Sequence, residues 1–165
     1  AGQLGSQPAP EFEFVGITQI PHQEAVTRAF SGKAEELPNL MASGFNSLMA
    51  ALGPDNPPSG AGFTYYTKAD PKKDIFIGRI GLPVQNLIHC DLEPEAVPTQ
   101  GNFFQVRYLG SYKHMELAWY TAMNHVFMTK QNWDKQRPSF EVYQVGPHNH
   151  DEDEQYVTDL FIPLK

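Results

Sequence analysis

A carboxylate inside a strand is the first candidate for chemistry in this sequence. Glu141 lies between Phe140 and Val142 in the run 140–145, where the preference of strands for branched and aromatic side chains disfavours an acid. Side chains alternate along a strand, so Glu141 and Tyr143 point to one face and Phe140 and Val142 to the other. On the residues alone, Glu141 is either an ordinary exposed charge or the acid of a binding site.

A partly buried carboxylate is costly unless another group answers its charge. A ligand cation, an arginine or several hydroxyl groups would do so, and Arg79 is the available arginine, paired with Glu141 or with Asp159. A carboxylate of this kind is also a potential general base, with Tyr143 beside it. A catalytic alternative therefore rests on Glu141 and Tyr143.

Three aromatic side chains are candidates for the walls of such a site. Tyr66 and Tyr143 occupy matching positions in two similar runs, Phe63–Tyr66 and Phe140–Tyr143. An organic cation over an aromatic face gains about 0.5–2 kcal/mol per ring. Trp119 is the third candidate, although an aromatic in a sheet or on an apolar helix stripe is also a common core residue.

Other groups of reactive residues indicate no chemistry. His148, His150 and the acids at 151–154 crowd one loop, but consecutive loop residues lack the spacing of zinc ligands, so we expect a solvated turn and no metal site. Cys90 and the adjacent His89 do not form a credible nucleophile pair. The sequence contains no nucleotide-binding loop, serine-nucleophile motif or zinc-hydrolase motif, and we expect no cofactor.

The elements that position these residues follow from hydrophobic periodicity. Alternating or β-rich runs predict strands at 11–20, 25–30, 63–67, 75–84, 103–109, 140–145 and 156–164. Apolar residues at three- and four-residue spacing predict two helices, from Leu37 to Leu52 and from Met115 to Phe127. Gly53 and Pro54 end the first helix.

The order strand, helix, strand, strand occurs twice. Phe30–Leu37 resembles Leu109–Leu117, Phe63–Tyr66 matches Phe140–Tyr143, and Gly81–Val84 matches Phe161–Leu164. Either unit alone would expose a sheet edge and half a core, so we expect the two to pair about a pseudo-twofold axis. The sequence therefore predicts the α+β class, with duplicated strand-helix-strand-strand units forming one antiparallel sheet and two helices on one face. Residues 11–165 are expected to form a single domain, with repeat halves at about 11–90 and 100–165, after a flexible arm at 1–10.

Four features of the second half, in this order, match a known family. They are the run Tyr108–Tyr112, an amphipathic helix, the run Phe140–Tyr143 and the run Thr158–Leu164. This succession resembles the GyrI-like domain, which is similar to the effector-binding domains of bacterial AraC-type and MerR-type multidrug-responsive regulators. The resemblance covers about Phe12 to Lys165. It implies a ligand groove between the two repeats, lined by aromatics and holding a carboxylate for lipophilic cations.

Carried over onto this sequence, the resemblance implies Glu141 and Asp159 as the acidic positions of the site. With the candidates found from the residues, the expected ligand-binding site contains Glu141, Tyr143, Tyr66, Trp119, Asp159, Phe161 and Arg79. The family often has a tryptophan near the end of its second helix, where this chain has Val126 and Phe127. The regulators also carry a helix-turn-helix domain for which this chain has no room, so we expect a stand-alone ligand-binding version. Three alternatives stay open: a hydrolase of reactive small molecules with Glu141 as general base, a gyrase-inhibitor-like interaction module, and a haem-binding module.

The charge balance narrows the classes of partner. Nineteen acidic against twelve basic residues give a net charge of −7, which repels phosphate backbones, so we expect no direct contact with nucleic acid. No apolar run reaches the roughly 18–20 residues needed to span a bilayer, and we expect no membrane contact. Cys90 is the only cysteine, so no intramolecular disulfide forms and a cytoplasmic location fits best. The predicted partner is a small, cationic organic molecule.

Overall fold

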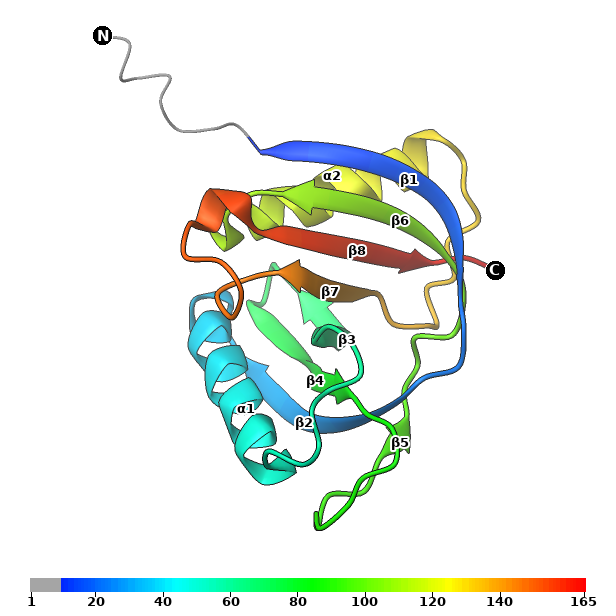
Figure 1. Ribbon diagram of the computed structural model, residues 1–165. Helices are drawn as coiled ribbons and strands as arrows, with labels where there is room; N and C mark the ends of the chain where they lie inside the picture. The colour runs from blue at the N-terminus through cyan, green and yellow to red at the C-terminus, as the bar shows by residue number, and fades with distance from the viewer. Residues whose placement is uncertain (1–9) are drawn as a thin grey trace, which may run out of the picture.

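The computed structural model describes residues 10–165, and in this part of the chain eight strands form one antiparallel sheet with two helices (Figure 1). The elements follow in the order β1 (Glu11–Ile20), β2 (Glu24–Gly32), α1 (Leu37–Leu52), β3 (Phe63–Asp70), β4 (Ile75–Pro83), β5 (Glu95–Ala96), β6 (Gly101–Leu109), α2 (Met115–Met128), β7 (Phe140–Val145) and β8 (Val157–Pro163). A short 3-10 turn precedes each helix, at Ala34–Glu36 and at Tyr112–His114. The predicted α+β class is confirmed. The arm predicted for residues 1–10 lies, apart from Pro10, outside the described residues.

Equivalent strands of the two units lie at equal distances from the two edges of the sheet. Its strand order is β1-β6-β8-β7-β3-β4-β2-β5, so β2, β3 and β4 of the first unit correspond to β6, β7 and β8 of the second. At the centre, Phe63 pairs with Val142, Thr64 with Glu141, and Tyr65 with Phe140. The pseudo-twofold axis therefore passes between Thr64 and Glu141, which are equivalent residues of the two units.

Both helices cover the same face of the sheet, here called the helix face. Leu48 and Leu52 of α1 pack on Ile80 of β4, and Ala118, Ala122 and Val126 of α2 pack on Leu160 and Ile162 of β8. In Figure 1, α2 lies behind β1 and β6. The opposite face, here called the open face, carries a cluster of phenylalanines from four strands, namely Phe63, Phe103, Phe140 and Phe161.

Close contact between α1 and the sheet depends on a glycine. A Cβ added at Gly44 would lie 2.3 Å from Cδ1 of Ile80, so any larger residue would push the helix or the isoleucine away. Ile80 is 1% exposed and its side chain fills the space under the helix. Because protein interiors are close-packed, this contact sets the distance of α1 from β4. Within residues 10–165, no helix is long and apolar enough to cross a membrane.

The strand pairing shows that one predicted match between the two repeats, that of Phe30 with Leu109, is wrong. Phe30 pairs with Gly78, and Tyr108 pairs with Thr158, while Gly78 and Thr158 pair in turn with the equivalent tyrosines of β3 and β7. Phe30 therefore corresponds to Tyr108 and not to Leu109, the residue matched with it in the sequence. The predicted alignment of the two repeats was therefore shifted by one residue at this point. The turns that follow Phe30 and Tyr108 differ in composition, so they could not fix the alignment.

Candidate ligand-binding site

Glu141 lies on the pseudo-axis and on the helix face, with only 2% of its surface exposed. The hydroxyl of Tyr66 donates a hydrogen bond of 2.7 Å to its Oε1, and the indole N–H of Trp119 donates a second of 3.1 Å to the same oxygen. Tyr66 comes from β3 and Trp119 from α2. The two repeats thus both contribute donors to one buried carboxyl group.

Tyr143 lies beside this group on the same face, as alternation predicts. Its hydroxyl is 2.6 Å from the hydroxyl of Thr64, the equivalent of Glu141 in the first unit. The sulfur of Met41 in α1 accepts a weak hydrogen bond from Tyr143 at 3.6 Å. Two groups of hydrogen-bonded side chains therefore lie at the axis, one joined to α1 through Met41 and the other to α2 through Trp119.

Burial raises the pKa of the Glu141 carboxyl above its usual value, and the donors around it, led by Tyr66, lower the pKa only in part. Burial also raises the pKa of the Tyr66 and Tyr143 hydroxyls well above the ordinary value, and the neighbouring charge of Glu141 adds to the effect. Both tyrosines consequently keep their protons and act as donors. Among residues 10–165, no lysine, arginine or histidine forms an ion pair with Glu141.

A groove of about 610 Å³ opens beside these residues, between α2, the end of β3 and the chain before β7. We call it the α2 groove. Tyr66 and Trp119 form part of its lining, and Glu141 lies directly behind them. The remaining lining residues are Thr67, Lys68, Ala69, Pro71, Glu116, Tyr120, Met123, Trp133, Lys135, Gln136, Arg137, Pro138 and Ser139. Because β3 and α2 belong to different units, the groove lies between the two repeats.

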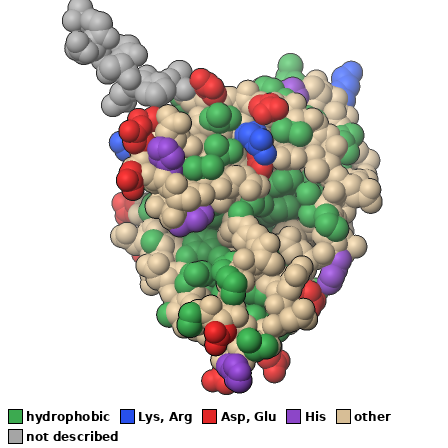
Figure 2. All heavy atoms as spheres, viewed as in Figure 1, with side chains coloured by type: hydrophobic (Ala, Val, Ile, Leu, Met, Phe, Trp, Pro, Cys, Tyr) green, Lys and Arg blue, Asp and Glu red, His purple; other side chains and the backbone are tan. Residues whose placement is uncertain are grey.

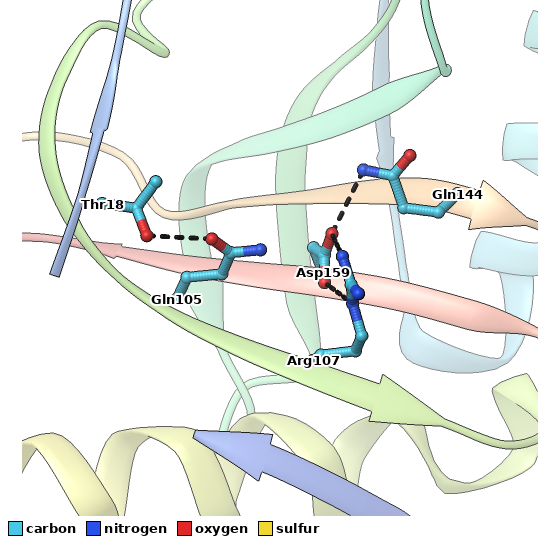
Figure 3. Close-up of polar contacts among 5 residues, drawn as sticks. All are labelled: Thr18, Gln105, Arg107, Gln144 and Asp159. Carbon is cyan, nitrogen blue, oxygen red and sulfur yellow. Dashed lines mark hydrogen bonds and ion pairs between the residues drawn. The ribbon is translucent and has the colours of Figure 1, made fainter. Parts of the chain in front are cut away.

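Asp159, Phe161 and Arg79 lie on the open face, so the structure does not bring these three predicted site residues together with Glu141. Asp159 pairs across the strands with Val142, whose side chain points away from the helices. The carboxylate of Asp159 is bound by Arg107, with nitrogen–oxygen distances of 2.9 and 3.1 Å, and by the amide of Gln144 at 3.1 Å (Figure 3).

The other two residues have partners of their own on the open face. The ring of Phe161 stacks on Phe140 with centroids 4.5 Å apart. Arg79 donates to the hydroxyl of Thr27 at 2.7 Å and lies 3.6 Å from the carboxylate of Glu95. The expected pairing of Arg79 with Glu141 is absent because the two side chains lie on opposite faces of the sheet. The expected pairing of Arg79 with Asp159 is also absent, because β7 and β3 lie between their strands, β8 and β4.

The open face has a smaller hollow of its own. Figure 2, viewed as Figure 1, shows apolar side chains gathered around a depression near the middle of the molecule. A cavity of about 140 Å³ lies between Phe63, Phe140 and Val142 on this side, and the buried hydroxyl of Thr99 belongs to its lining. This hollow contains no charged side chain in its lining, and it differs in that respect from the α2 groove.

Thr64, Trp133 and Lys68 lie in or beside the site, and sequence reasoning missed them. Thr64 could have been found from the repeat, because it is the residue that matches Glu141 when Phe63 is aligned with Phe140. Trp133 and Lys68 lie outside the matched runs, and no local pattern marks them as groove residues. The sequence predicted Trp119 to be either a core residue or a wall of the site. In the structure it lines the groove and also packs against the core.

The duplicated α+β fold, with an aromatic groove between its two units, is that of a small-molecule-binding domain. The family model of the GyrI-like small-molecule-binding domain matches residues 9–165, and the chain belongs to this family. A comparison with curated protein sequences finds no match.

Several solved structures share the fold at low sequence identity. The C-terminal domain of EcmrR has 15% identity and a TM-score of 0.75, with 96% of this chain and 99% of that chain covered. SAV2435 bound to tetraphenylphosphonium has 14% identity and a TM-score of 0.64, with 94% of each chain covered. A hydrolase encoded by lin2189 from Listeria innocua has 14% identity and a TM-score of 0.54, with 99% and 95% covered. At these identities the similarity shows the common fold.

Proposed function

We propose that the α2 groove binds a lipophilic organic cation and that Glu141 is its charge partner. The observation that carries the proposal is a carboxyl group 2% exposed on the pseudo-axis, held by two aromatic donors and by no basic side chain of residues 10–165. An ionised carboxylate in that position lacks a compensating charge, and a bound cation would supply it. The similar protein SAV2435 was solved with an organic cation, tetraphenylphosphonium, which agrees with this class of ligand.

The walls of the site are aromatic. Tyr66 and Trp119 meet edge to face with their ring centroids 6.3 Å apart, and Tyr120 and Trp133 line the same groove. A cation in the groove would lie against these rings, whose faces attract positive charge. Tyr143, behind the groove, would hold the other side of the polar cluster through Thr64.

Direct contact between a groove ligand and Glu141 requires a side-chain movement. Tyr66 and Trp119 separate the carboxyl group from the groove, and each uses its polar hydrogen to bind Oε1. Rotation of the Trp119 side chain would open the carboxylate to the ligand while Tyr66 stays in place. Rotamer changes of this size are common when proteins bind ligands.

Calorimetric titration with tetraphenylphosphonium tests the proposal in wild type, Glu141→Gln and Glu116→Gln. Glu116 lines the same groove but is exposed, so it is a matched control for loss of one negative charge. Removing a buried charge partner costs about 2–5 kcal/mol, or roughly 30- to several-thousand-fold in affinity. Removing an exposed one costs about 0–1 kcal/mol, or at most roughly fivefold. An unchanged affinity in Glu141→Gln, or equal losses in both variants, would refute the role of Glu141.

A hydrolase is the second candidate, with Glu141 as general base and Tyr143 beside it. The raised pKa of a buried carboxyl group suits a general base, which works best when its pKa is near the operating pH. One protein with the same fold is described as a hydrolase. Turnover of a reactive electrophile such as styrene oxide, abolished in Glu141→Gln, would favour this candidate over simple binding.

We also propose that the chain makes no direct contact with DNA and acts in the cytoplasm. Its net charge of −7 opposes binding to phosphate backbones. Its single cysteine, Cys90, is free and suits a reducing compartment.

A further inference from the structure

The mouth of the α2 groove is basic although the chain as a whole is acidic. Lys68, Lys135 and Arg137 stand in its lining against a single acid, Glu116. The whole sequence has twelve basic residues against nineteen acidic ones. The sign of the charge is therefore reversed at this one opening, above the aromatic rings and the buried carboxyl group.

Two of the three basic residues are free to meet a ligand. The guanidinium of Arg137 is engaged, because it donates to the carbonyl oxygens of Leu164 at 2.9 Å and Gln100 at 2.7 Å. Lys68 and Lys135 are exposed, and neither forms an ion pair with any residue in the described part of the chain.

The nearby acids and rings leave these two lysines available. Asp70, at the end of β3, and Asp74, in the turn that follows, accept hydrogen bonds from backbone N–H groups. The ammonium of Lys135 lies 5.5 Å from the centre of the Trp133 ring, and Trp133 is itself a groove residue. This cation–π contact holds the Lys135 charge over the groove.

The fold does not impose a lysine at this place. The strand pairing of Lys68 with Ile77 in the first unit matches that of Val145 with Val157 in the second. The residue equivalent to Lys68 is thus the apolar Val145, so the fold accepts either a lysine or an apolar residue at this position. The positive charge of Lys68 is therefore not required by the fold.

We propose that the ligand of the α2 groove is zwitterionic, with an anionic group that binds Lys68 and Lys135 at the mouth. The inference rests on the proposed function, in which the cationic aromatic part of the same ligand lies inside, against Tyr66 and Trp119. The groove volume of about 610 Å³ is in the ordinary range for a drug-sized molecule, so one ligand can reach from the rings to the lysines. The inner part of the groove would then bind the positive charge of the ligand, and the lysines at the mouth would bind its negative charge.

A matched pair of dyes tests the inference. Rhodamine 110 carries a free carboxylate beside its cationic ring system, and rhodamine 123 is its methyl ester, which lacks that negative charge. Fluorescence anisotropy titrations at low and high salt give both affinities in wild type and in the double variant Lys68→Gln/Lys135→Gln. The variant Lys33→Gln/Lys165→Gln removes the same charge at exposed positions outside the groove lining and is the control.

We expect wild type to prefer the free acid over the ester by roughly two- to thirtyfold, as two exposed ion pairs allow. The preference should fall at high salt, vanish in Lys68→Gln/Lys135→Gln and persist in the control variant. Equal affinities for both dyes in wild type, or a preference that survives in Lys68→Gln/Lys135→Gln, would overturn the inference.

The same titrations separate this inference from the proposed function. Glu141→Gln should weaken both dyes alike and leave their ratio unchanged. If Glu141→Gln loses affinity but wild type shows no preference for the acid over the ester, Glu141 is still supported as the charge partner and the zwitterionic ligand is refuted. If the preference depends on the lysines but Glu141→Gln has no effect, the role of Glu141 is refuted and the zwitterionic ligand is still supported. Failure of both dyes to bind would count against both.

Discussion

Replacement of Trp119 by phenylalanine should remove one hydrogen bond from the buried carboxyl group while keeping an aromatic ring in the groove. The indole N–H of Trp119 donates to Oε1 of Glu141 at 3.1 Å, and a hydrogen bond to an ionised group contributes about 1.5–3 kcal/mol to stability. Phenylalanine also loses part of the packing of the larger ring. Trp133→Phe suffers a comparable packing loss in the same groove, but Trp133 has no bond to Glu141.

The difference between these two variants therefore isolates the bond to Glu141. Urea denaturation followed by far-ultraviolet circular dichroism gives both free energies of unfolding without relying on tryptophan fluorescence. We expect Trp119→Phe to be less stable than Trp133→Phe by about 1.5–3 kcal/mol at neutral pH. In a Glu141→Gln background the extra cost should fall to the neutral-bond value of about 0.5–1.5 kcal/mol. If Trp119→Phe is no worse than Trp133→Phe, the indole does not stabilise the carboxylate and the reasoning fails.

Two further results follow from the placement of the acids. Because burial raises the pKa of Glu141 in the folded state, the folded protein binds more protons than the unfolded chain above about pH 4.5, and the contribution of this group to stability is lost as the pH rises towards its folded pKa. Chemical denaturation over a pH series should thus show Glu141→Gln gaining stability relative to wild type as the pH rises, and a flat or falling difference would contradict the shift. Asp159→Asn should lower the free energy of unfolding by about 1–3 kcal/mol, less than a fully buried pair costs because Arg107 is partly exposed. Calorimetry should find its tetraphenylphosphonium affinity unchanged, since Asp159 lies on the open face, and a large loss would show that the two faces are coupled.

Local patterns were sufficient to predict most of the fold. Strands and helices with four or more periodic residues, such as α1 and β7, have a hydrophobic period that identifies both their type and their buried face. β5 was missed because Glu95–Ala96 has only two residues, too few to show any period. The duplication was recognisable because its matched runs include aromatic pairs such as Phe63 and Phe140. Its register at Phe30 was off by one residue, since a turn of variable composition offers no such reference.

The sequence brought together the site residues that share a strand, as well as Tyr66, which the repeat matches with Tyr143. Alternation along β7 placed Glu141 and Tyr143 together correctly, because both residues belong to the same run. The placement of Asp159 required the register between β7 and β8, and this register includes an irregularity between Tyr143 and Val145. Asp159 pairs with Val142 before that irregularity, and a register shifted by one residue would turn its side chain to the helix face. The loop at 146–156 gives no local sign of this register, so the sequence could not assign Asp159 to the open face.

The pseudo-axis also explains why the two repeats had to differ where the site lies. Thr64 and Glu141 are direct partners across the central strands, and side chains at such positions lie about 4.5–5.5 Å apart at Cβ. Perfect duplication would place two buried carboxyl groups at this distance, where like charges cannot both be ionised without a large cost. With threonine in the first unit, the hydroxyl instead binds Tyr143 at 2.6 Å and leaves a single carboxyl group for Tyr66 and Trp119. The fold therefore supplies two equivalent positions, and the divergence of one of them leaves a single acid on the axis, as the proposed binding of one cation requires.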